Sequence, residues 1–146
     1  MITPALVDLD LPGDDRVAAT RALAQRLHAE GRVTDLDGFL ADVAAREAQM
    51  PTGLEGGIGI PHARSAHVTE PTLAFGRCAD GVDFGAADGP ATLVFLIAAP
   101  AEGDADHMTI LAKLARRLVR PAFREHLMTV ADATAASSYI TEEVGS

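Results

Sequence analysis

Cysteine, tryptophan and basic charge are all scarce in this sequence. Its 146 residues include one cysteine, Cys78, and no tryptophan, and the formal net charge is −9. A lone cysteine offers no disulfide framework, which favours a reducing compartment. The excess of acidic residues argues against nucleic acid as a partner, because phosphate backbones attract basic surfaces.

Long hydrophobic runs are missing as well. The longest run, Ala91 to Ala101, is shorter than the roughly 20 residues that a membrane-spanning helix requires. The N-terminal residues lack the basic segment and apolar run that together mark a signal peptide. These absences predict a cytoplasmic protein with no direct membrane insertion.

The length and the hydrophobic content fit a single domain. The chain has 146 residues, of which 48% are hydrophobic, and this is enough for one core of ordinary size. No internal repeat, linker or low-complexity segment divides the sequence. We therefore interpret residues 1–146 as one domain.

Strand-like and helical patterns alternate along the chain. Alternating polarity predicts a strand over Ala5–Leu11, and the continuous apolar run Ala91–Ala98 predicts a central strand that is buried on both faces. Apolar residues at i, i+3, i+4 and i+7 predict a helix with one buried stripe, formed by Leu36, Phe39, Leu40 and Val43. The pattern indicates the α/β class: a three-layer sandwich in which a mixed β-sheet of about five strands carries helices on both faces.

Helix boundaries are indicated by capping residues. Asp14 is placed to cap a first helix in which Val17 faces the core, and Thr34 followed by Asp37 resembles a capping box for the second helix. Gly103 and Asp104 are expected to start a third helix behind the central strand.

The stretch from Pro51 to His67, PTGLEGGIGIPHARSAH, is rich in glycine and contains two histidines. Proline fixes its own φ, has no N–H, and pushes the preceding residue toward an extended conformation. Gly57–Ile60 is therefore predicted to end a strand, with His62 held just beyond it. Because ligands meet α/β sheets at strand ends, His62 is a candidate site residue. The alternative is a surface histidine in a glycine-rich turn.

His107 is a second candidate, since it lies in the first turn of the third predicted helix. A helix N-terminus offers unpaired N–H groups and positive potential to an anion. Strands that end near Pro61 and Pro100 can bring this helix start and His62 to one edge of the sheet. The alternative is a helix-start residue bonded to a nearby carboxylate.

The remaining histidines carry weaker signals. His28 and His126 lie on predicted helices without a useful pattern around them, which favours structural or surface roles. His67 follows Arg64 in what is predicted to be a polar loop, and we expect it to be exposed.

The segment Arg46–Ala63, REAQMPTGLEGGIGIPHA, resembles the active-site region of the fructose/mannitol-type (type 2) enzyme IIA domains of the bacterial phosphoenolpyruvate-dependent sugar phosphotransferase system, the PTS. The resemblance extends over nearly the whole chain, including the segments RVTDLDGFLADV, ADGVDFG and DHMTILAKLA. Two positions depart from the usual pattern: Glu55 replaces a glycine, and Gly59 replaces an alanine.

The resemblance implies a phosphotransferase component, a phosphocarrier that needs neither a metal nor a cofactor. By similarity, His62 accepts a phosphoryl group from the histidine of the carrier protein HPr and becomes a tele-phosphohistidine. It then passes the group to a cysteine of an enzyme IIB domain, which phosphorylates sugar during uptake through a membrane permease, IIC. His107 and Arg46 match the family's supporting residues beside the phosphohistidine.

The chemistry of phosphoryl transfer agrees with these roles. An imidazole attacks phosphorus only through an unprotonated nitrogen, so its other nitrogen needs a carbonyl or carboxylate acceptor. Charge on the phosphoryl oxygens needs donors aimed at it, and His107, Arg46 and loop N–H groups are the candidates. Without the family match, Arg46 would be interpreted as a solvated cation at a helix end. Thr52 either donates its hydroxyl to phosphate or caps a turn.

Two other functions compete with transport. The first is a regulatory, nitrogen-type EIIA paralogue, which would use the same phosphohistidine to change its binding to target proteins. The second is a metal-dependent hydrolase using His62, His107 and an aspartate, although a pattern such as H-E-x-x-H is absent. Cys78 is interpreted as a buried strand residue and not as an enzyme IIB cysteine.

Overall fold

Six strands and five α-helices form within the residues that the computed structural model describes, which are 2–13, 15–101 and 106–144, with side chains omitted for 106–111. In chain order the elements are η1 (Pro4–Leu6), β1 (Val7–Asp8), α1 (Arg16–Ala29), α2 (Leu36–Gln49), β2 (Gly53–Leu54), β3 (Ile58–Gly59), β4 (His62–Ser65), β5 (Thr72–Val82), β6 (Ala91–Pro100), α3 (Asp106–Leu118), α4 (Pro121–Thr129) and α5 (Ala133–Val144).

The strands form one mixed sheet around β6. The order is β1-β5-β6-β3-β2, and β4 also pairs with β6. β6 runs antiparallel to β5 and parallel to both β3 and β4, so it is hydrogen-bonded on its two sides. All residues from Leu93 to Ala99 are buried, as expected for a strand covered on both faces. The prediction of a central strand here is confirmed.

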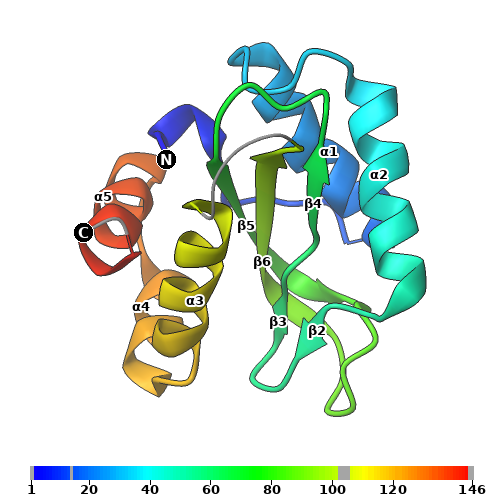
Figure 1. Ribbon diagram of the computed structural model, residues 1–146. Coiled ribbons are helices and arrows are strands. Elements are labelled where there is room, and N and C mark those ends of the chain that lie inside the picture. Colours follow the sequence, from blue (N-terminus) through cyan, green and yellow to red (C-terminus); the bar gives the residue numbers. More distant parts are fainter. Residues whose placement is uncertain (1, 14, 102–105, 145–146) are drawn as a thin grey trace.

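Helices cover both faces of the sheet. Figure 1 shows α1 and α2 on one side and α3, α4 and α5 on the other, with the strands between them. α1 packs on β5, α2 packs on β4, and α3 and α4 pack on β6. The predicted three-layer α/β sandwich is confirmed, with six strands where the sequence indicated about five.

The N-terminal part differs from two predictions. The strand predicted over Ala5–Leu11 is reduced to the two residues of β1, because Pro4 starts a turn of 3₁₀-helix ahead of it. Val17, predicted to face the core, is 69% exposed. It lies two positions before the buried Ala19, and residues two apart do not share a helix face.

The helix starts also differ in detail. Asp14 lies outside the described residues, and α1 is capped by Asp15, whose carboxylate accepts from the Ala18 N–H at 2.7 Å. α2 is capped by Asp35, and the hydroxyl of Thr34 donates to the His67 carbonyl instead, so the predicted capping box is wrong. The expected start of the third helix, at residues 103 and 104, also lies outside the described residues, and α3 begins at Asp106.

No helix in the described part of the chain has both the length and the apolar composition needed to cross a membrane.

Candidate active site

β3 and β4 are two pieces of one extended segment that is interrupted at Pro61. Both run parallel to β6 in one register, because Gly59 lies opposite Val94 and His62 lies opposite Ile97. The Pro61 carbonyl accepts from the Ile97 N–H at 3.0 Å, whereas proline itself has no N–H to donate. His62 therefore opens a second strand segment instead of lying beyond a strand end, since β6 continues past the proline as a pairing partner.

The His62 ring is half-buried and is held by the backbone just before it. Its Nδ1 lies 2.9 Å from the carbonyl oxygen of Ile60. A carbonyl oxygen can only accept, so Nδ1 carries the proton and donates it. In the neutral ring Nε2 then keeps its unshared electron pair. The contact selects the tautomer in which Nε2 can act as a nucleophile.

β4 presents His62 and Arg64 on its outer face. Ala63 and Ser65 are buried at 7% and 2% exposure, whereas His62 is half-buried and Arg64 is exposed. This is the alternation of a half-buried strand. Arg64 was predicted to lie in a loop, and its place in β4 corrects that prediction. Its Nη2 donates to the Ala101 carbonyl at 3.1 Å, at the end of β6.

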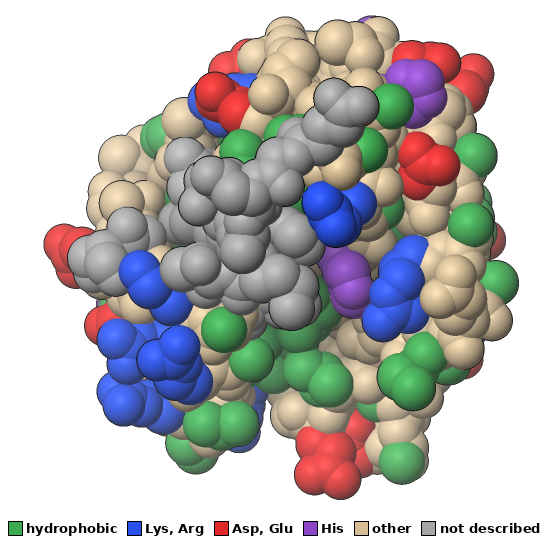
Figure 2. All heavy atoms as spheres, in the orientation of Figure 1, with side chains coloured by type: hydrophobic (Ala, Val, Ile, Leu, Met, Phe, Trp, Pro, Cys, Tyr) green, Lys and Arg blue, Asp and Glu red, His purple; other side chains and the backbone are tan. Residues whose placement is uncertain are grey.

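Helix α2 packs beside β4 and carries a second cation. Its one arginine, Arg46, is half-buried, and Nη1 lies 3.4 Å from the Met50 carbonyl at the end of the helix. Figure 2 shows a histidine between two basic side chains where α2 and β4 lie in Figure 1. In sequence, α2 contains one basic residue, Arg46, and β4 contains one histidine, His62, and one basic residue, Arg64.

Thr52 is engaged with a neighbour in this structure. Its N–H donates to Oε2 of Glu47 at 2.8 Å, and its hydroxyl donates to Oε1 of the same carboxylate. Thr52 is 8% exposed. A role for this hydroxyl as a donor to phosphate stays a prediction, and it would require the hydroxyl to leave Glu47.

His107 is the second residue of α3, and its side chain lies outside the described part of the chain. Its predicted place beside His62 stays a prediction. Its helix packs on β6, the strand to which β4 is hydrogen-bonded.

The other described histidines, His28, His67 and His126, contact neighbouring residues away from His62. The Nδ1 of His28 lies 2.9 Å from the Val33 carbonyl, and the ring of His126 contacts Tyr139 in a tilted arrangement with centroids 3.9 Å apart. His67 was expected to be exposed but is half-buried over Gly38, where a Cβ would come within 2.5 Å of its Nε2.

Glu55 and Gly59, the two positions at which the glycine-rich stretch departs from the expected pattern, differ in exposure. Glu55 is exposed in the turn between β2 and β3. Gly59 is buried, and a Cβ there would lie 2.6 Å from Cδ2 of Phe84. The Phe84 ring thus occupies the space that an alanine side chain would need.

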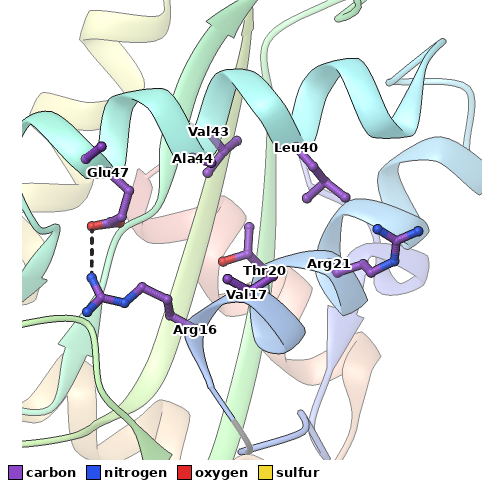
Figure 3. A pocket seen from close by; sticks show the side chains of 9 residues that line it. Arg16, Val17, Thr20, Arg21, Leu40, Val43, Ala44 and Glu47 are labelled. Atoms are coloured by element: carbon purple, nitrogen blue, oxygen red, sulfur yellow. Dashed lines mark ion pairs between the residues drawn. The ribbon is translucent and has the colours of Figure 1, made fainter.

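An apolar groove of about 330 Å³ lies between α1 and α2, and Figure 3 shows the side chains that line it. Arg16 of α1 and Glu47 of α2 face each other across one end, with Nη1 and Oε2 3.8 Å apart. The remaining lining residues are Val17, Thr20, Arg21, Leu40, Val43, Ala44 and Ala48.

Sequence reasoning missed two residues of this region. Arg64 could have been found from strand alternation, since it lies two positions after His62 and shares its face. Glu47 lies near the end of α2, and nothing local in the sequence indicates that its carboxylate binds Thr52. Among the described residues, no three His, Cys, Asp or Glu side chains are grouped as metal ligands would be.

Comparison with known proteins relates the whole chain to one family. The family described as "Phosphoenolpyruvate-dependent sugar phosphotransferase system, EIIA 2" matches residues 1–143. The fructose-specific EIIA component of Haloferax volcanii is 39% identical over 145 residues, which cover 98% of this chain and 94% of that protein. The fructose-specific EIIABC component of Bacillus subtilis is 34% identical over 129 residues, which cover 88% of this chain and 20% of that protein.

A solved structure agrees with these sequence relationships. The crystal structure of the nitrogen regulatory protein IIA-Ntr from Neisseria meningitidis matches this fold with a TM-score of 0.86 at 31% identity, covering 95% of each chain.

Proposed function

The chain belongs to the EIIA 2 family of the phosphoenolpyruvate-dependent sugar phosphotransferase system, and on this basis we propose that it carries a phosphoryl group on Nε2 of His62. Phospho-HPr is the proposed donor and a cysteine of an enzyme IIB domain is the proposed acceptor. The transfer supports sugar uptake through a membrane permease, IIC. As a phosphotransferase component, the protein works in the cytoplasm without direct insertion into the membrane.

One observation carries the proposal: the hydrogen bond between Nδ1 of His62 and the Ile60 carbonyl. It leaves Nε2 as the nitrogen that can attack phosphorus, which is the geometry of a tele-phosphohistidine. The rigid Ile60–Pro61 backbone holds the ring in place. A positioned nucleophile of this kind lowers the barrier because the reacting atoms need less reorganisation.

In each of the two transfer steps, one bond to phosphorus forms while another bond to phosphorus breaks. The Nε2 electron pair of His62 forms a bond to phosphorus while the phosphorus–nitrogen bond of phospho-HPr breaks, and the HPr imidazole leaves. In the second step a cysteine thiolate of enzyme IIB forms a sulfur–phosphorus bond while the bond from His62 to phosphorus breaks. The relative named EIIABC, in which the matched segment is 20% of the length, supports enzyme IIB and IIC as partners.

Positive charge near His62 supports the same reaction. The transferring phosphoryl group spreads its negative charge over three oxygens, which calls for donors around it. Arg64 of β4, the strand of His62, and Arg46 of α2, the helix that packs on that strand, are two proposed donors, and His107 is the third. The Arg46 guanidinium would exchange the Met50 carbonyl, 3.4 Å away, for a phosphoryl oxygen.

The test is transfer between purified proteins. The chain is incubated with phosphoenolpyruvate, enzyme I and HPr, and the label is located by peptide mapping with mass spectrometry. We expect one phosphoryl group on His62, labile in acid and stable in alkali as a phosphoramidate is. Label on another residue, or none at all, would contradict the proposal.

A regulatory role is the second candidate, favoured by the likeness to the nitrogen regulatory protein of Neisseria meningitidis. Both roles use the same phosphohistidine, so the second transfer step separates them. Phosphorylated protein is mixed with a fructose-type enzyme IIB domain. Transfer to its cysteine supports the transport carrier, whereas retention of the group on His62 supports the regulatory role.

A further inference from the structure

We infer that Glu47 is a positioning residue for His62, acting through Thr52 and the backbone of Ile60. The inference rests on the proposed function, because it concerns the same histidine. Glu47 reaches His62 through four hydrogen bonds and not through a direct bond, so it takes no part in the chemistry itself.

The first contacts fasten the chain that leaves α2. Both carboxylate oxygens of Glu47 bind Thr52, one through the N–H at 2.8 Å and the other through the hydroxyl. The Glu47 side chain is 11% exposed, and a shielded carboxylate forms stronger hydrogen bonds than one in water. Two bonds to one residue fix both the position and the orientation of Thr52.

The next contacts carry this constraint to the histidine. The Thr52 carbonyl accepts the Ile60 N–H at 3.1 Å. The Ile60 carbonyl accepts the His62 Nδ1–H at 2.9 Å. Between Ile60 and His62 the chain passes through Pro61, whose fixed φ leaves little freedom to absorb a displacement. A movement of Thr52 is therefore transmitted to the carbonyl that selects the His62 tautomer.

Arg16 also contacts this carboxylate. Its Nη1 lies 3.8 Å from Oε2 of Glu47, and the pair joins α1 to α2 at the end of the apolar groove shown in Figure 3. The ion pair places a positive charge beside the carboxylate that binds Thr52. The helix layer is thereby connected to the histidine through hydrogen bonds.

The test measures the His62 ring and the transfer rate separately. Nitrogen-detected NMR of the imidazole reports the tautomer, and it needs no phosphoryl donor. In Glu47→Ala we expect the Nδ1–H tautomer to lose its dominance and the rate of phosphorylation by phospho-HPr to fall roughly tenfold, as for other lost positioning contacts. Glu47→Gln keeps one oxygen acceptor, so it should recover part of both readouts.

The matched control is Glu143→Ala on α5, which removes another partly exposed glutamate, 3.2 Å from Arg117. It should leave the tautomer and the rate unchanged. If Glu47→Ala does not fold, the comparison of Glu47→Gln with wild type decides the matter. An unchanged tautomer in the folded Glu47 variants, or the same change in Glu143→Ala, would overturn the inference.

Failure of the proposed function has a different signature. If wild type is never labelled on His62 but Glu47→Ala still changes the tautomer, the positioning role holds and the phosphocarrier proposal fails. If wild type is labelled on His62 and neither readout moves in the Glu47 variants, the phosphocarrier proposal holds and the positioning role fails.

Discussion

His62 depends on a single backbone carbonyl for its tautomer. The Ile60 oxygen lies 2.9 Å from Nδ1, and this contact decides which ring nitrogen carries the proton. Arg46 and Arg64 are proposed to stabilise the developing charge on a phosphoryl group. Nucleophile and stabilising donors should therefore respond differently to substitution.

Separate substitutions of His62 and His107 test this difference. His62→Gln should abolish stable phosphorylation, because it removes the only proposed nucleophile. His107→Ala should still be phosphorylated on His62, but more slowly. Loss of one charge-assisted hydrogen bond costs about 1.5–3 kcal/mol, which corresponds to a rate loss on the order of ten- to a hundredfold. Peptide mapping of each labelled variant is the measurement. Label on His107 would reverse the assignment.

Arg46 is tested by keeping its charge and changing its shape. Arg46→Lys loses the planar fork, so phosphorylation should slow by roughly tenfold while folding survives, and Arg46→Ala should be slower still. The control is Arg116→Lys, because Arg116 also donates to a carbonyl four residues away, at 3.4 Å, on α3. Equal rates for wild type and both Arg46 variants would show that Arg46 only caps the end of α2.

At the scale of elements, β3 packs closely against the segment that follows β5. Gly59 has no Cβ, and Phe84 fills the place where one would lie, 2.6 Å from the ring. Phe84 is 1% exposed, so its ring has little room to move. An alanine at position 59 and Phe84 in its present position exclude each other.

Gly59→Ala should therefore destabilise the fold by about 1–3 kcal/mol, the usual cost of overpacking a core. Urea denaturation gives the free energy of unfolding. Gly59→Ala combined with Phe84→Leu should be more stable than the sum of the two single changes, because the smaller side chain makes room for the methyl group. Strict additivity in this double-mutant cycle would contradict the explanation.

Helices α4 and α5 meet through ring contacts, and the tyrosine among these rings can be titrated directly. Tyr139 stacks on Phe123 and lies in a tilted contact with His126, with centroids 5.5 and 3.9 Å apart. Burial raises the pKa of Tyr139 above its ordinary value of 10.0; the Glu143 carboxylate adds to the rise and the Arg117 guanidinium opposes it. The folded state thus favours the neutral phenol.

The chain has one tyrosine and no tryptophan, so phenolate absorbance reports Tyr139 alone. We expect a titration midpoint above 10.0 in the folded protein. The associated stabilisation is complete below the pKa of the unfolded state and is lost as the pH rises through the folded value. Glu143→Gln should lower the midpoint, since it removes a raising charge. A midpoint at or below 10.0 would contradict the predicted shift.

At the scale of the whole molecule, β6 joins the layers. Phe95 on this strand is fully buried and lies 5.0 Å from Phe75 of β5 and 6.5 Å from Phe123 of α4, between ring centroids. Phe123 in turn contacts Tyr139 of α5. The aromatic contacts connect the centre of the sheet to the outer helices.

Truncation of the Phe95 side chain should therefore destabilise the fold. Phe95→Ala leaves a cavity and should lower the free energy of unfolding by about 3–5 kcal/mol, whereas Phe95→Leu should cost less. The control is Val119→Ala, because Val119 is 75% exposed and its truncation should change stability by less than about 0.5 kcal/mol. Denaturation curves of the three variants provide the measurement. Equal losses for Phe95→Ala and Val119→Ala would contradict the role of Phe95.

The sequence by itself determined the fold class, the central strand and the family. Local patterns were sufficient because a continuous apolar run such as Ala91–Ala98 is typical of a strand that is buried on both faces of a sheet. The motif around His62 was equally local, since Pro61 and its neighbours are consecutive in the chain. The residue that holds His62 in its tautomer is likewise only two positions away.

Only the tertiary structure decided which contacts hold the chain around Pro61 and His62 in place. Whether the chain beyond Pro61 leaves the sheet or resumes pairing depends on β6, more than 30 residues later in the chain. The bond from Glu47 to Thr52 and the fit of Phe84 over Gly59 depend on side-chain directions that no local pattern specifies. These contacts join segments through packing, and packing is determined only when all elements are in place.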